Sequence, residues 1–466
     1  MIKEGVYMIN IQSDSRKIKP GDTFIALRGI SSDGHSYINK AIENGATKII
    51  VEEINEDYDV DTLLVKDTRE YLDNYLAENY NKFVDEMNIV AITGTNGKTT
   101  TAKLLHDVLN KMGSKTAYIG TIGFYIGEKI CDLPNTTVDI CDTYDLLMKA
   151  YDAGCNNVVM EISSHAAANG RVKTLKFDYA IFTNLTQDHL DFHKTMGNYA
   201  LAKQKVFKAL KQDGVAIINN DDKYKEYFLL PENNNFTYSF DNGDLYIKNC
   251  EMDQNGTKFS YVYNKKVYKV HTKLLGKYNI YNLLALISTL TAMGLKQDTI
   301  IKYIPELEAP VGRMQIIKYK TNTIIIDYAH TPDAIENIMS TLKDITKGDT
   351  YVVFGCTGDR DRLKRPIMTE YVANNSKHFI ITNDDPHYED PSQIVDDMTK
   401  DLEFDNYEVC LDREEAIVRG INLLNENDIL FILGKGHEEN IVIKDKKIPF
   451  NDYKVVKAYL ERKGNE

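Results

Sequence analysis

The chain lacks the features that mark membrane, secreted and disulfide-stapled proteins. No apolar run reaches the roughly 20 residues that a membrane span needs, and the N-terminal residues lack the apolar segment of a secretory signal. Its six cysteines form no C-x-x-C pair, which indicates reduced thiols in the core or on the surface. We therefore expect a cytoplasmic protein with no membrane span.

Positive charge is also scarce. The 69 Asp and Glu residues outnumber the 56 Lys and Arg residues, so the formal net charge is −13, which argues against a nucleic-acid partner. What the chain does have is an apolar fraction of 43%, enough for large cores, and a length of 466 residues, which suggests two to four domains. We expect an α/β protein with three domains, at residues 1–88, 89–312 and 313–466.

The stretch from Asn88 to Met112 carries the clearest chemical signal. It predicts a short apolar strand, Ile89–Ile92, then a glycine-containing turn and a helix to about Met112. The N–H groups of such a turn hold phosphate oxygens, and a lysine at the helix start reaches the terminal phosphates. The usual pattern has a further glycine where Ile92 stands, so the match is to a shorter form, and an ordinary strand-to-helix turn is the alternative. The candidate phosphate-binding residues are Gly94, Thr95, Asn96, Gly97, Lys98, Thr99 and Thr100.

The first 88 residues predict a small α/β domain. A polar loop that contains Ser13 and Arg16 leads through a turn at Pro20-Gly21 into a strand, and His35 follows in a second polar loop. These side chains could bind an anionic ligand. Local evidence alone favours solvated loop residues.

Residues 89–312 alternate strands with helices after the phosphate-binding turn, which predicts a doubly wound parallel sheet. Ligands of such sheets bind at the carboxyl ends of the strands. From Phe236 to His271 the pattern changes to short alternating runs separated by turns, which indicates antiparallel strands added to the parallel sheet.

Two strands of this domain end in residues that can hold a metal ion. The first ends near Glu161, and the second leads to Asp188-His189. A carboxylate and an imidazole beside a phosphate cradle suit Mg²⁺ that protein and substrate phosphates hold jointly. A polar loop is one alternative. A zinc site is another, although only His189 and His193 would supply its ligands.

Residues 313–466 repeat the α/β alternation, with a polar motif after each of four expected strands. This order places a second site on the carboxyl edge of a sheet, and solvated loops are the alternative. The strands are Thr323–Ile326, Thr350–Phe354, Phe379–Thr382 and Ile429–Leu433, and their motifs begin at Asp327, Gly358, Asn383 and Gly434.

Together, in this order, the motifs closely resemble the Mur ligases over essentially the whole chain. The stretch from Ser13 to Gly29 and the triplet Asn135-Thr136-Thr137 are similar to the MurE-type, tripeptide-forming members. The resemblance implies a UDP-binding N-terminal domain, a central ATPase domain and a Rossmann-like C-terminal domain. The motifs that carry it are 93–100, 161–165, 184–193, Gly276-x-x-Asn279-x-x-Asn282, Gly312-Arg313, 327–332, 358–360 and 434–438.

The resemblance implies an ATP-dependent ligase of peptidoglycan precursor synthesis. ATP would phosphorylate the γ-carboxylate of UDP-N-acetylmuramoyl-L-alanyl-D-glutamate, and a diamino acid would attack the acyl phosphate. The implied catalytic residues are Lys98, His189 and Lys203, and Thr99, Glu161, His189 and Lys203 would hold Mg²⁺. The nucleotide would also contact Asn184, Asn282, Arg313 and Asp327, and the UDP-sugar-peptide would contact Ser13, Ser15, His35, Asn135, Thr136, Thr137, Ser163 and Arg171.

Lys203 matches the family lysine that is carbamylated. A neutral amine that adds CO₂ becomes an anion, and its oxygens are ligands that Mg²⁺ accepts. From the sequence alone, a solvated lysine on a helix would be the simpler interpretation. The resemblance favours the carbamate.

The acceptor is predicted from the loop that contains His387. Members of the family that add meso-diaminopimelate have Asp-Asn-Pro-Arg there. The arginine binds the distal carboxylate through two parallel hydrogen bonds. A neutral histidine cannot form two such charged hydrogen bonds. Asp384, Asp385 and Glu389 would make an acidic pocket mouth suited to an ammonium group. We therefore expect L-lysine in preference to meso-diaminopimelate. The expected acceptor-binding residues are Arg360, Asp384, Asp385, His387, Glu389, Gly434 and Glu438.

Two other functions compete with this one. The first is a ligase of the same superfamily with another substrate, such as folylpolyglutamate synthase or cyanophycin synthetase, against which the Ser13–Gly29 stretch and Thr136-Thr137 argue. The second is a non-catalytic Mur-like binding protein, against which the intact catalytic residues argue. We expect a monomer whose partners are ATP, the UDP-muramoyl dipeptide and a diamino acid.

Overall fold

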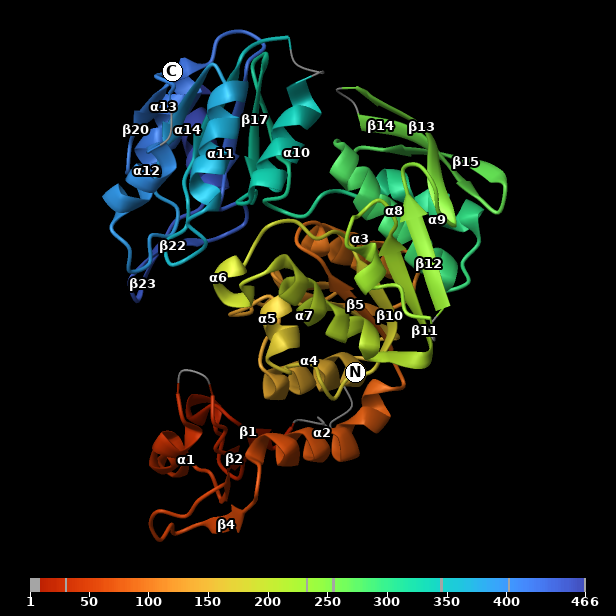
Figure 1. The fold of residues 1–466 in the computed structure, drawn as a ribbon, viewed down its shortest axis with the longest axis vertical. Coiled ribbons are helices and arrows are strands. Elements are labelled where there is room, and N and C mark those ends of the chain that lie inside the picture. Colours follow the sequence, from red (N-terminus) through yellow and green to blue (C-terminus); the bar gives the residue numbers. More distant parts are fainter. Residues whose placement is uncertain are drawn as a thin grey trace.

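The computed structural model describes residues 9–29, 32–231, 234–253, 256–343, 347–400 and 403–464. The described strands form sheets of four, eleven and six strands and one two-stranded hairpin. The three larger sheets follow one another along the long axis of the molecule, with the N-terminal sheet at one end and the C-terminal sheet at the other (Figure 1). Among the described helices, none is long and apolar enough to span a membrane.

The N-terminal domain is a small parallel sheet with strands in the order β1-β2-β3-β4. Phe24 and Ile49 pack with Ile38 of α1 in a core of their own. Ile25 and Ile50 instead join the core that this domain shares with the central domain. The elements are β1 (Ile11–Gln12), β2 (Thr23–Ile25), α1 (Ile38–Glu43), β3 (Lys48–Val51), β4 (Asp61–Leu64) and the connecting helix α2 (Thr68–Val84).

The central domain is built on the eleven-stranded sheet. Its strands from β13 through β12, β11, β10, β5 and β9 to β6 are parallel neighbours. Antiparallel strands extend both edges. The strands are β5 (Asn88–Thr93), β6 (Thr116–Gly120), β7 (Gly123–Ile126), β8 (Glu128–Cys131), β9 (Asn157–Glu161), β10 (Phe177–Phe182), β11 (Leu210–Asn219), β12 (Asn234–Ser239), β13 (Leu245–Asp253), β14 (Gly256–Tyr263) and β15 (Lys266–Thr272).

The predicted parallel sheet is confirmed, but the prediction for its added strands is partly wrong. β12 and β13 pair in parallel with their preceding neighbours, and the antiparallel part begins only at β14. Short alternating runs do not reveal strand direction, because parallel and antiparallel strands share the same two-residue period. The β7–β8 hairpin at the other edge was not predicted.

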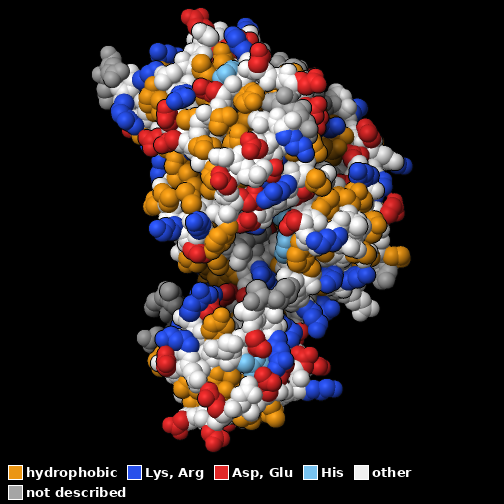
Figure 2. Space-filling model, turned by 60° about the vertical axis from the view of Figure 1, so that its left-hand side comes forward, with side chains coloured by type: hydrophobic (Ala, Val, Ile, Leu, Met, Phe, Trp, Pro, Cys, Tyr) orange, Lys and Arg blue, Asp and Glu red, His pale blue; other side chains and the backbone are white. Residues whose placement is uncertain are grey.

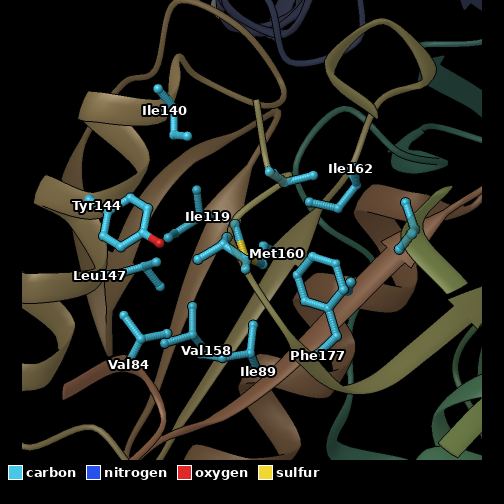
Figure 3. Packing of buried hydrophobic residues seen from close by; sticks show 14 of the residues in the cluster. Val84, Ile89, Ile119, Ile140, Tyr144, Leu147, Val158, Met160, Ile162 and Phe177 are labelled. Carbon is cyan, nitrogen blue, oxygen red and sulfur yellow. The ribbon is translucent and has the colours of Figure 1, made fainter. Parts of the chain in front are cut away.

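Helices cover both faces of the central sheet. On one face Val84 of α2 and Tyr144 and Leu147 of α4 pack against Ile89 and Val158 of the sheet (Figure 3). Helices α3 and α8 cover the other face. Burying each apolar side chain of this kind stabilises the folded state by about 1.5–3 kcal/mol. The two helical layers therefore hold in place the sheet edge that carries the phosphate-binding turn. The helices are α3 (Lys98–Lys111), α4 (Ile140–Asp152), α5 (Ser164–Ala168), α6 (Leu190–His193), α7 (Met196–Lys208), α8 (Lys277–Ala292) and α9 (Gln297–Tyr303).

The C-terminal domain has strands in the order β16-β17-β21-β18-β19-β20, parallel except for β16. Four of them match the strands predicted from the sequence. The edge strands β16 and β20 and the hairpin β22–β23 were not predicted. The elements are β16 (Gln315–Tyr319), β17 (Asn322–Asp327), α10 (Pro332–Lys343), β18 (Thr350–Phe354), α11 (Lys364–Asn375), β19 (His378–Ile381), α12 (Pro391–Thr399), β20 (Tyr407–Val409), α13 (Arg413–Leu423), β21 (Ile429–Leu433), β22 (Asn440–Ile443), β23 (Lys446–Pro449) and α14 (Asp452–Gly464).

The N-terminal domain is tied to the central domain by ion pairs. Lys17 pairs with Asp142 at 2.6 Å, and Asp73 pairs with Lys173 at 3.2 Å. Figure 2 shows a waist between this domain and the rest of the molecule. On the face shown there, acidic and basic side chains are interspersed rather than gathered in one basic patch.

Candidate active site

The phosphate-binding turn joins β5 to α3 and is shaped by two glycines. Gly94 and Gly97 have φ angles of 152° and 84°. A Cβ atom at these positions would lie 1.9 and 2.5 Å from neighbouring side-chain oxygens, so a side chain is excluded at both. Asn184 braces the turn, because its Oδ1 accepts from Asn96 N at 2.9 Å and its Nδ2 donates to Asn96 O at 3.1 Å.

Two lysines meet at this turn. The Nζ atoms of Lys98 and Lys203 lie 2.9 and 2.6 Å from Gly94 O, and Lys98 also donates to Thr95 O at 2.7 Å. Lys203 extends from α7, is 1% exposed and lies over the ring of Tyr199. Burial lowers the pKa of both ammonium groups, and the charge of Lys98 lowers that of Lys203 further. The buried position therefore favours a neutral amine at Lys203.

Glu161 lies at the end of β9 and is fully buried among donors. It accepts from Thr99 Oγ1 at 2.8 Å, from Thr121 N and Oγ1 at 3.0 and 3.1 Å, and from Tyr118 OH at 2.5 Å. The carboxylate and the Thr99 hydroxyl are the hard oxygen ligands that Mg²⁺ prefers. The sequence analysis missed Tyr118, because a tyrosine inside an apolar strand looks like an ordinary core residue.

His189 lies beside Asp188 at the start of α6, with a left-handed φ of 55°. Asp188 pairs with His189 at 3.3 Å and, across the domain boundary, with Lys364 at 3.5 Å and His330 at 4.0 Å. Burial opposes ionisation of Asp188, but the charge of Lys364 and the neighbouring histidines hold its pKa well below its usual range. Burial lowers the pKa of His189 to about 3, so its imidazole is neutral at pH 7 and suited to bind a metal ion.

A cavity of about 320 Å³ lies beside the turn. Its lining includes Thr100 of the central domain, and Arg313 and Asp327 near the hinge, the junction between the central and C-terminal domains at residues 312–313. Arg313 Nη2 donates to Thr99 Oγ1 at 3.3 Å, and the guanidinium lies 4.5 Å from the ring centre of Tyr328. The Nε atom of Arg313 is buried without a partner among the described residues. A buried donor of this kind points to an absent acceptor, which an anionic ligand would supply.

Asp327 and Asn282 line the same cavity but are held by the protein itself. Both carboxylate oxygens of Asp327 accept backbone N–H groups, from Met314 at 2.6 Å and Ala329 at 2.7 Å. Asp327 therefore fixes the hinge that carries Arg313. Asn282 hydrogen-bonds to side chains of α3 and α8, which holds its amide beside the phosphate-binding turn.

The central and C-terminal domains contact each other over this cavity. Asn96 Nδ2 donates to Asp333 Oδ2 at 2.8 Å, and Gln187 Nε2 donates to Asp361 Oδ2 at 3.5 Å. Together with the pairing of Asp188, these contacts bring the C-terminal domain against the phosphate-binding turn.

A second group of predicted residues surrounds the backbone of Glu161. Thr137 Oγ1 donates to Glu161 O at 2.8 Å and accepts from Ser163 N at 3.0 Å. Arg171 Nη1 donates to Thr137 O at 2.9 Å, and the hydroxyl oxygens of Thr136 and Thr121 lie 3.0 Å apart. The structure thus brings four of the predicted substrate-binding residues to the edge of the candidate metal site.

The remaining residues of that prediction lie farther out. Ser13 hydrogen-bonds Cys141 at the start of α4, which follows the loop that contains the exposed Asn135. Ser15 is buried within the N-terminal domain. His35 uses both ring nitrogens in that domain, one toward a carboxylate at 2.7 Å and one accepting a backbone N–H at 3.0 Å.

The acids of the predicted pocket mouth are paired with basic side chains, which the sequence did not predict. Lys435 is fully buried, and its Nζ lies 2.8 Å from Asp385, 2.7 Å from Glu438 and 3.5 Å from Asp384. Glu389 pairs with two arginines at 3.2 and 2.8 Å. The sequence analysis missed Lys435, although a lysine between two glycines directly after a core strand was a usable signal.

The packing around this cluster is tight. A Cβ atom at Gly434, where φ is 111°, would lie 2.6 Å from Asp384 Oδ2. Burial raises the pKa of Asp384 and raises that of Glu438 to about 7, although the charge of Lys435 opposes both shifts. The Glu438 side chain is 30% exposed, while those of Asp384 and Asp385 are 3% and 11% exposed. Glu438 is therefore the carboxylate of this cluster that a ligand reaches most easily.

His387 lies where the loop after β19 meets the β22–β23 hairpin. It has a left-handed φ of 50°, its N–H donates to Val442 O at 3.1 Å, and its carbonyl accepts from Lys444 N at 2.8 Å. Val442 N donates in turn to Asp385 Oδ1 at 2.8 Å. Arg360 is exposed and donates to the carbonyl of the preceding residue at 3.1 Å.

Three matches to domains of the Mur ligases follow the three sheets. Residues 8–80 match the Mur ligase family catalytic domain, residues 92–290 the Mur ligase middle domain, and residues 312–436 the Mur ligase glutamate ligase domain.

Relatives match over nearly the full length. A Bacillus cereus protein named UDP-N-acetylmuramoyl-L-alanyl-D-glutamate--2,6-diaminopimelate ligase is 40% identical over 474 residues, which is 100% of this chain and 96% of the relative. A protein of the same name from Aquifex aeolicus is 40% identical over 97% of this chain and 94% of its own length. The chain therefore belongs to the Mur ligase family of ATP-dependent amide ligases.

Within that family, the relatives similar in sequence are of the MurE type. A solved structure titled as a UDP-N-acetylmuramoyl-L-alanyl-D-glutamate--2,6-diaminopimelate ligase has 31% identity and a TM-score of 0.67, and the match covers 98% of this chain and 95% of that one. A Thermotoga maritima MurF ligase has a TM-score of 0.72 but 18% identity, and a Mycobacterium tuberculosis folylpolyglutamate synthase has 0.65 and 15%. These two share the fold alone.

Proposed function

We propose that this chain joins a diamino acid to the D-glutamyl residue of UDP-N-acetylmuramoyl-L-alanyl-D-glutamate, with conversion of ATP to ADP and phosphate. The observation that carries the proposal is the arrangement of Lys98, Lys203 and Glu161 around one phosphate-binding turn. The names of the MurE-type relatives supply the substrates. The reaction belongs to peptidoglycan precursor synthesis.

The reaction has two steps. The γ-carboxylate of the D-glutamyl residue attacks the γ-phosphorus of ATP, ADP leaves, and an acyl phosphate forms. The α-amino nitrogen of the acceptor then attacks the acyl carbon and loses a proton, and phosphate leaves with the electrons of the carbon–oxygen bond. Lys98 and the N–H groups of the turn offset the charge that develops on the transferred phosphoryl group. Arg313 contributes its unpartnered N–H from the hinge.

Thr99, Glu161, His189 and Lys203 would hold Mg²⁺. The donor set fits such an ion, because it combines a hydroxyl beside a buried carboxylate with an imidazole that is neutral at pH 7. Lys203 completes the set as a carbamate, since burial lowers the pKa of its amine and the neutral amine adds CO₂. When bound, the ion would neutralise phosphate charge.

The UDP-sugar-peptide binds along the loop that contains Thr136 and Thr137, next to Ser163 and Arg171. The support is that Thr137 hydrogen-bonds to Glu161 O and accepts from Ser163 N and Arg171 Nη1, so a dipeptide lying there ends close to the transferred phosphate. Ser13, Ser15, His35 and Asn135 form the outer part of the proposed site toward the N-terminal domain.

The acceptor is a diamino acid, and we keep L-lysine as the preferred one. The relatives are named for 2,6-diaminopimelate. His387 stands where diaminopimelate-adding members carry arginine, and a carboxylate, Asp385, stands where they carry asparagine. A distal carboxylate on the acceptor would then face Glu438, the most exposed acid of the cluster, without a bidentate partner. The loop after β18 supplies an exposed cation, Arg360.

The test is phosphate release from ATP with one component omitted at a time. We expect release only when the UDP-muramoyl dipeptide, Mg²⁺ and an amino acid are all present. A panel of L-lysine, L-ornithine, meso-diaminopimelate and glutamate then identifies the acceptor. Release with folate and glutamate, or no release with any UDP-muramoyl peptide, would overturn the proposal.

A further inference from the structure

Lys435 is the buried cation at the centre of the acceptor region. Its side chain is 0% exposed, and its ammonium lies 2.7 Å from Glu438 Oε2 and 2.8 Å from Asp385 Oδ1. Asp384 follows at 3.5 Å. The ammonium therefore contacts all three carboxylates of the cluster from the protein side.

The three carboxylates depend on this cation for their arrangement. Asp384, Asp385 and Glu438 offer oxygens that lie within 4.8 Å of one another. Without a counter-charge, like charges at such distances repel, and burial adds to the cost of ionising them. The next buried cation, Arg413, is already paired with Asp452 through two hydrogen bonds of 2.8 Å. It cannot replace Lys435 without giving up that pair.

The hydrogen bonds and exposed fractions of the three carboxylates show which oxygen a ligand can reach. Lys435 binds Oε2 of Glu438, while Oε1 accepts no hydrogen bond from the described residues. Asp385 uses Oδ1 for both Lys435 and Val442 N. Glu438 is the most exposed acid of the three, so its second oxygen faces outward when the first is held.

We propose that Lys435 is a positioning residue for the acceptor: its ammonium holds Glu438 and Asp385 so that the free oxygen of Glu438 receives the distal amino group of the diamino acid. This inference rests on the proposed function. Lys435 acts through the carboxylates and does not touch the reacting atoms. It therefore affects binding of the acceptor. Formation of the acyl phosphate, which needs ATP, Mg²⁺ and the UDP-muramoyl dipeptide but no acceptor, stays intact.

The experiment separates these two half-reactions in the Lys435→Met variant. Acyl phosphate is trapped with hydroxylamine in the absence of acceptor, and the acceptor KM is measured in the full reaction. We expect trapping close to wild type and an acceptor KM raised about tenfold to a hundredfold, as for the loss of one charged hydrogen bond. Lys435→Arg keeps the charge and should recover part of the KM. The matched control is Lys454→Met, which removes an exposed lysine paired with Glu439 at 2.5 Å and should change neither quantity.

An acceptor KM unchanged in a folded Lys435→Met protein overturns the inference, and so does an equal loss of trapping and of acceptor binding. If Lys435→Met does not fold, the double variant Lys435→Met/Asp385→Asn removes one charge of each sign. Its acceptor KM should exceed that of the single variant Asp385→Asn, and equality of the two overturns the inference. Failure of the proposed function looks different, because wild type itself would then yield no trapped acyl phosphate.

Discussion

Lys98 and Lys203 donate to the same carbonyl oxygen, that of Gly94, at 2.9 and 2.6 Å. Two charged ammonium groups at one acceptor repel each other, and burial lowers the pKa of both. This repulsion between the two ammonium groups is removed if Lys203, which is the more deeply buried, is neutral. The buried position of Lys203 beside Lys98 therefore supports the proposal that Lys203 is carbamylated.

The first prediction concerns that lysine. Lys203→Ala should be nearly inactive, because the anionic oxygens of the carbamate are lost from the metal site. A millimolar short-chain carboxylate such as acetate should restore part of the activity by supplying those oxygens. The measurement is phosphate release with and without acetate.

Lys205→Ala is the matched control for this variant, since Lys205 lies on the same helix and donates to a backbone carbonyl at the surface. It should keep wild-type activity and show no response to acetate. Full activity of Lys203→Ala in CO₂-free buffer would refute the carbamate.

The second prediction is that Lys98→Ala removes ATP turnover and leaves the fold intact. Loss of a charged stabiliser of a phosphoryl transition state costs about 10²–10³ in rate. Phosphate release gives the rate, and circular dichroism checks the fold. Lys111→Ala, at the exposed end of the same helix, is the control. Near-normal turnover of a folded Lys98→Ala protein would contradict the role given to the turn.

The third prediction concerns Tyr118, whose hydroxyl lies 2.5 Å from Glu161 Oε1. Tyr118→Phe should weaken binding of the divalent ion roughly tenfold, because a hydrogen bond to a buried charge contributes about 1.5–3 kcal/mol. Mn²⁺ binding followed by electron paramagnetic resonance gives the affinity without relying on turnover. Tyr125→Phe is the control, since its ring packs against Tyr118 at 5.6 Å without contacting Glu161. Equal Mn²⁺ affinities in the two variants would show that Tyr118 does not contribute to the metal site.

The fourth prediction is a pH dependence of acceptor binding. Burial raises the pKa of Glu438 to about 7 from 4.5, so the folded protein holds this proton more tightly than the unfolded chain between pH 4.5 and 7. Its contribution to stability is therefore full below about 4.5 and is lost as pH rises toward 7. Over the same rise Glu438 becomes ionised and attracts the acceptor ammonium, so the acceptor KM should fall between pH 6 and 8. Glu438→Gln should raise the KM and abolish this dependence, and a persisting dependence would assign it to another group.

The fifth prediction is a preference for L-lysine over meso-diaminopimelate. With His387 in place of an arginine, a distal carboxylate loses a charged hydrogen bond of about 1–3 kcal/mol, roughly tenfold to a hundredfold in kcat/KM. The two kcat/KM values decide the preference. His387→Arg should then shift it toward diaminopimelate. If wild type favours diaminopimelate, another cation reads its carboxylate, and Arg360→Ala is the next variant to measure.

The sequence was sufficient for the parts of the fold that depend on local patterns. The strands around the phosphate-binding turn and four strands of the C-terminal sheet have strong apolar runs bounded by polar motifs, so both their existence and their type followed from periodicity. The edge strands and hairpins did not, because segments such as β16 (QIIKY), β20 (YEV) and β23 (KKIP) are short and mix polar with apolar residues. Strand direction at β12 and β13 was missed although each pairs with the strand directly before it in the chain, because the two-residue period is the same for both directions.

In the candidate site, too, local patterns were predictable and long-range contacts were not. Residues within one motif, such as those of the turn around Gly94 and Gly97, were predicted correctly as neighbours. Contacts between motifs were not: the burial of Lys435 between acids from two loops changes the charge that the sequence alone assigned to the acceptor region. The placement of Tyr118 on Glu161 likewise depends on the sheet order β9-β6, which joins strands that lie apart in sequence.

The backbone ladder between His387 and the β22–β23 hairpin has a practical consequence for protein engineering. His387 exchanges two main-chain hydrogen bonds with the hairpin, and Val442 N binds the side chain of Asp385. A graft that swaps only the loop between relatives would place new side chains on a frame set by the old hairpin. We therefore expect that a transplanted loop keeps its conformation only when residues 440–449 are transplanted with it.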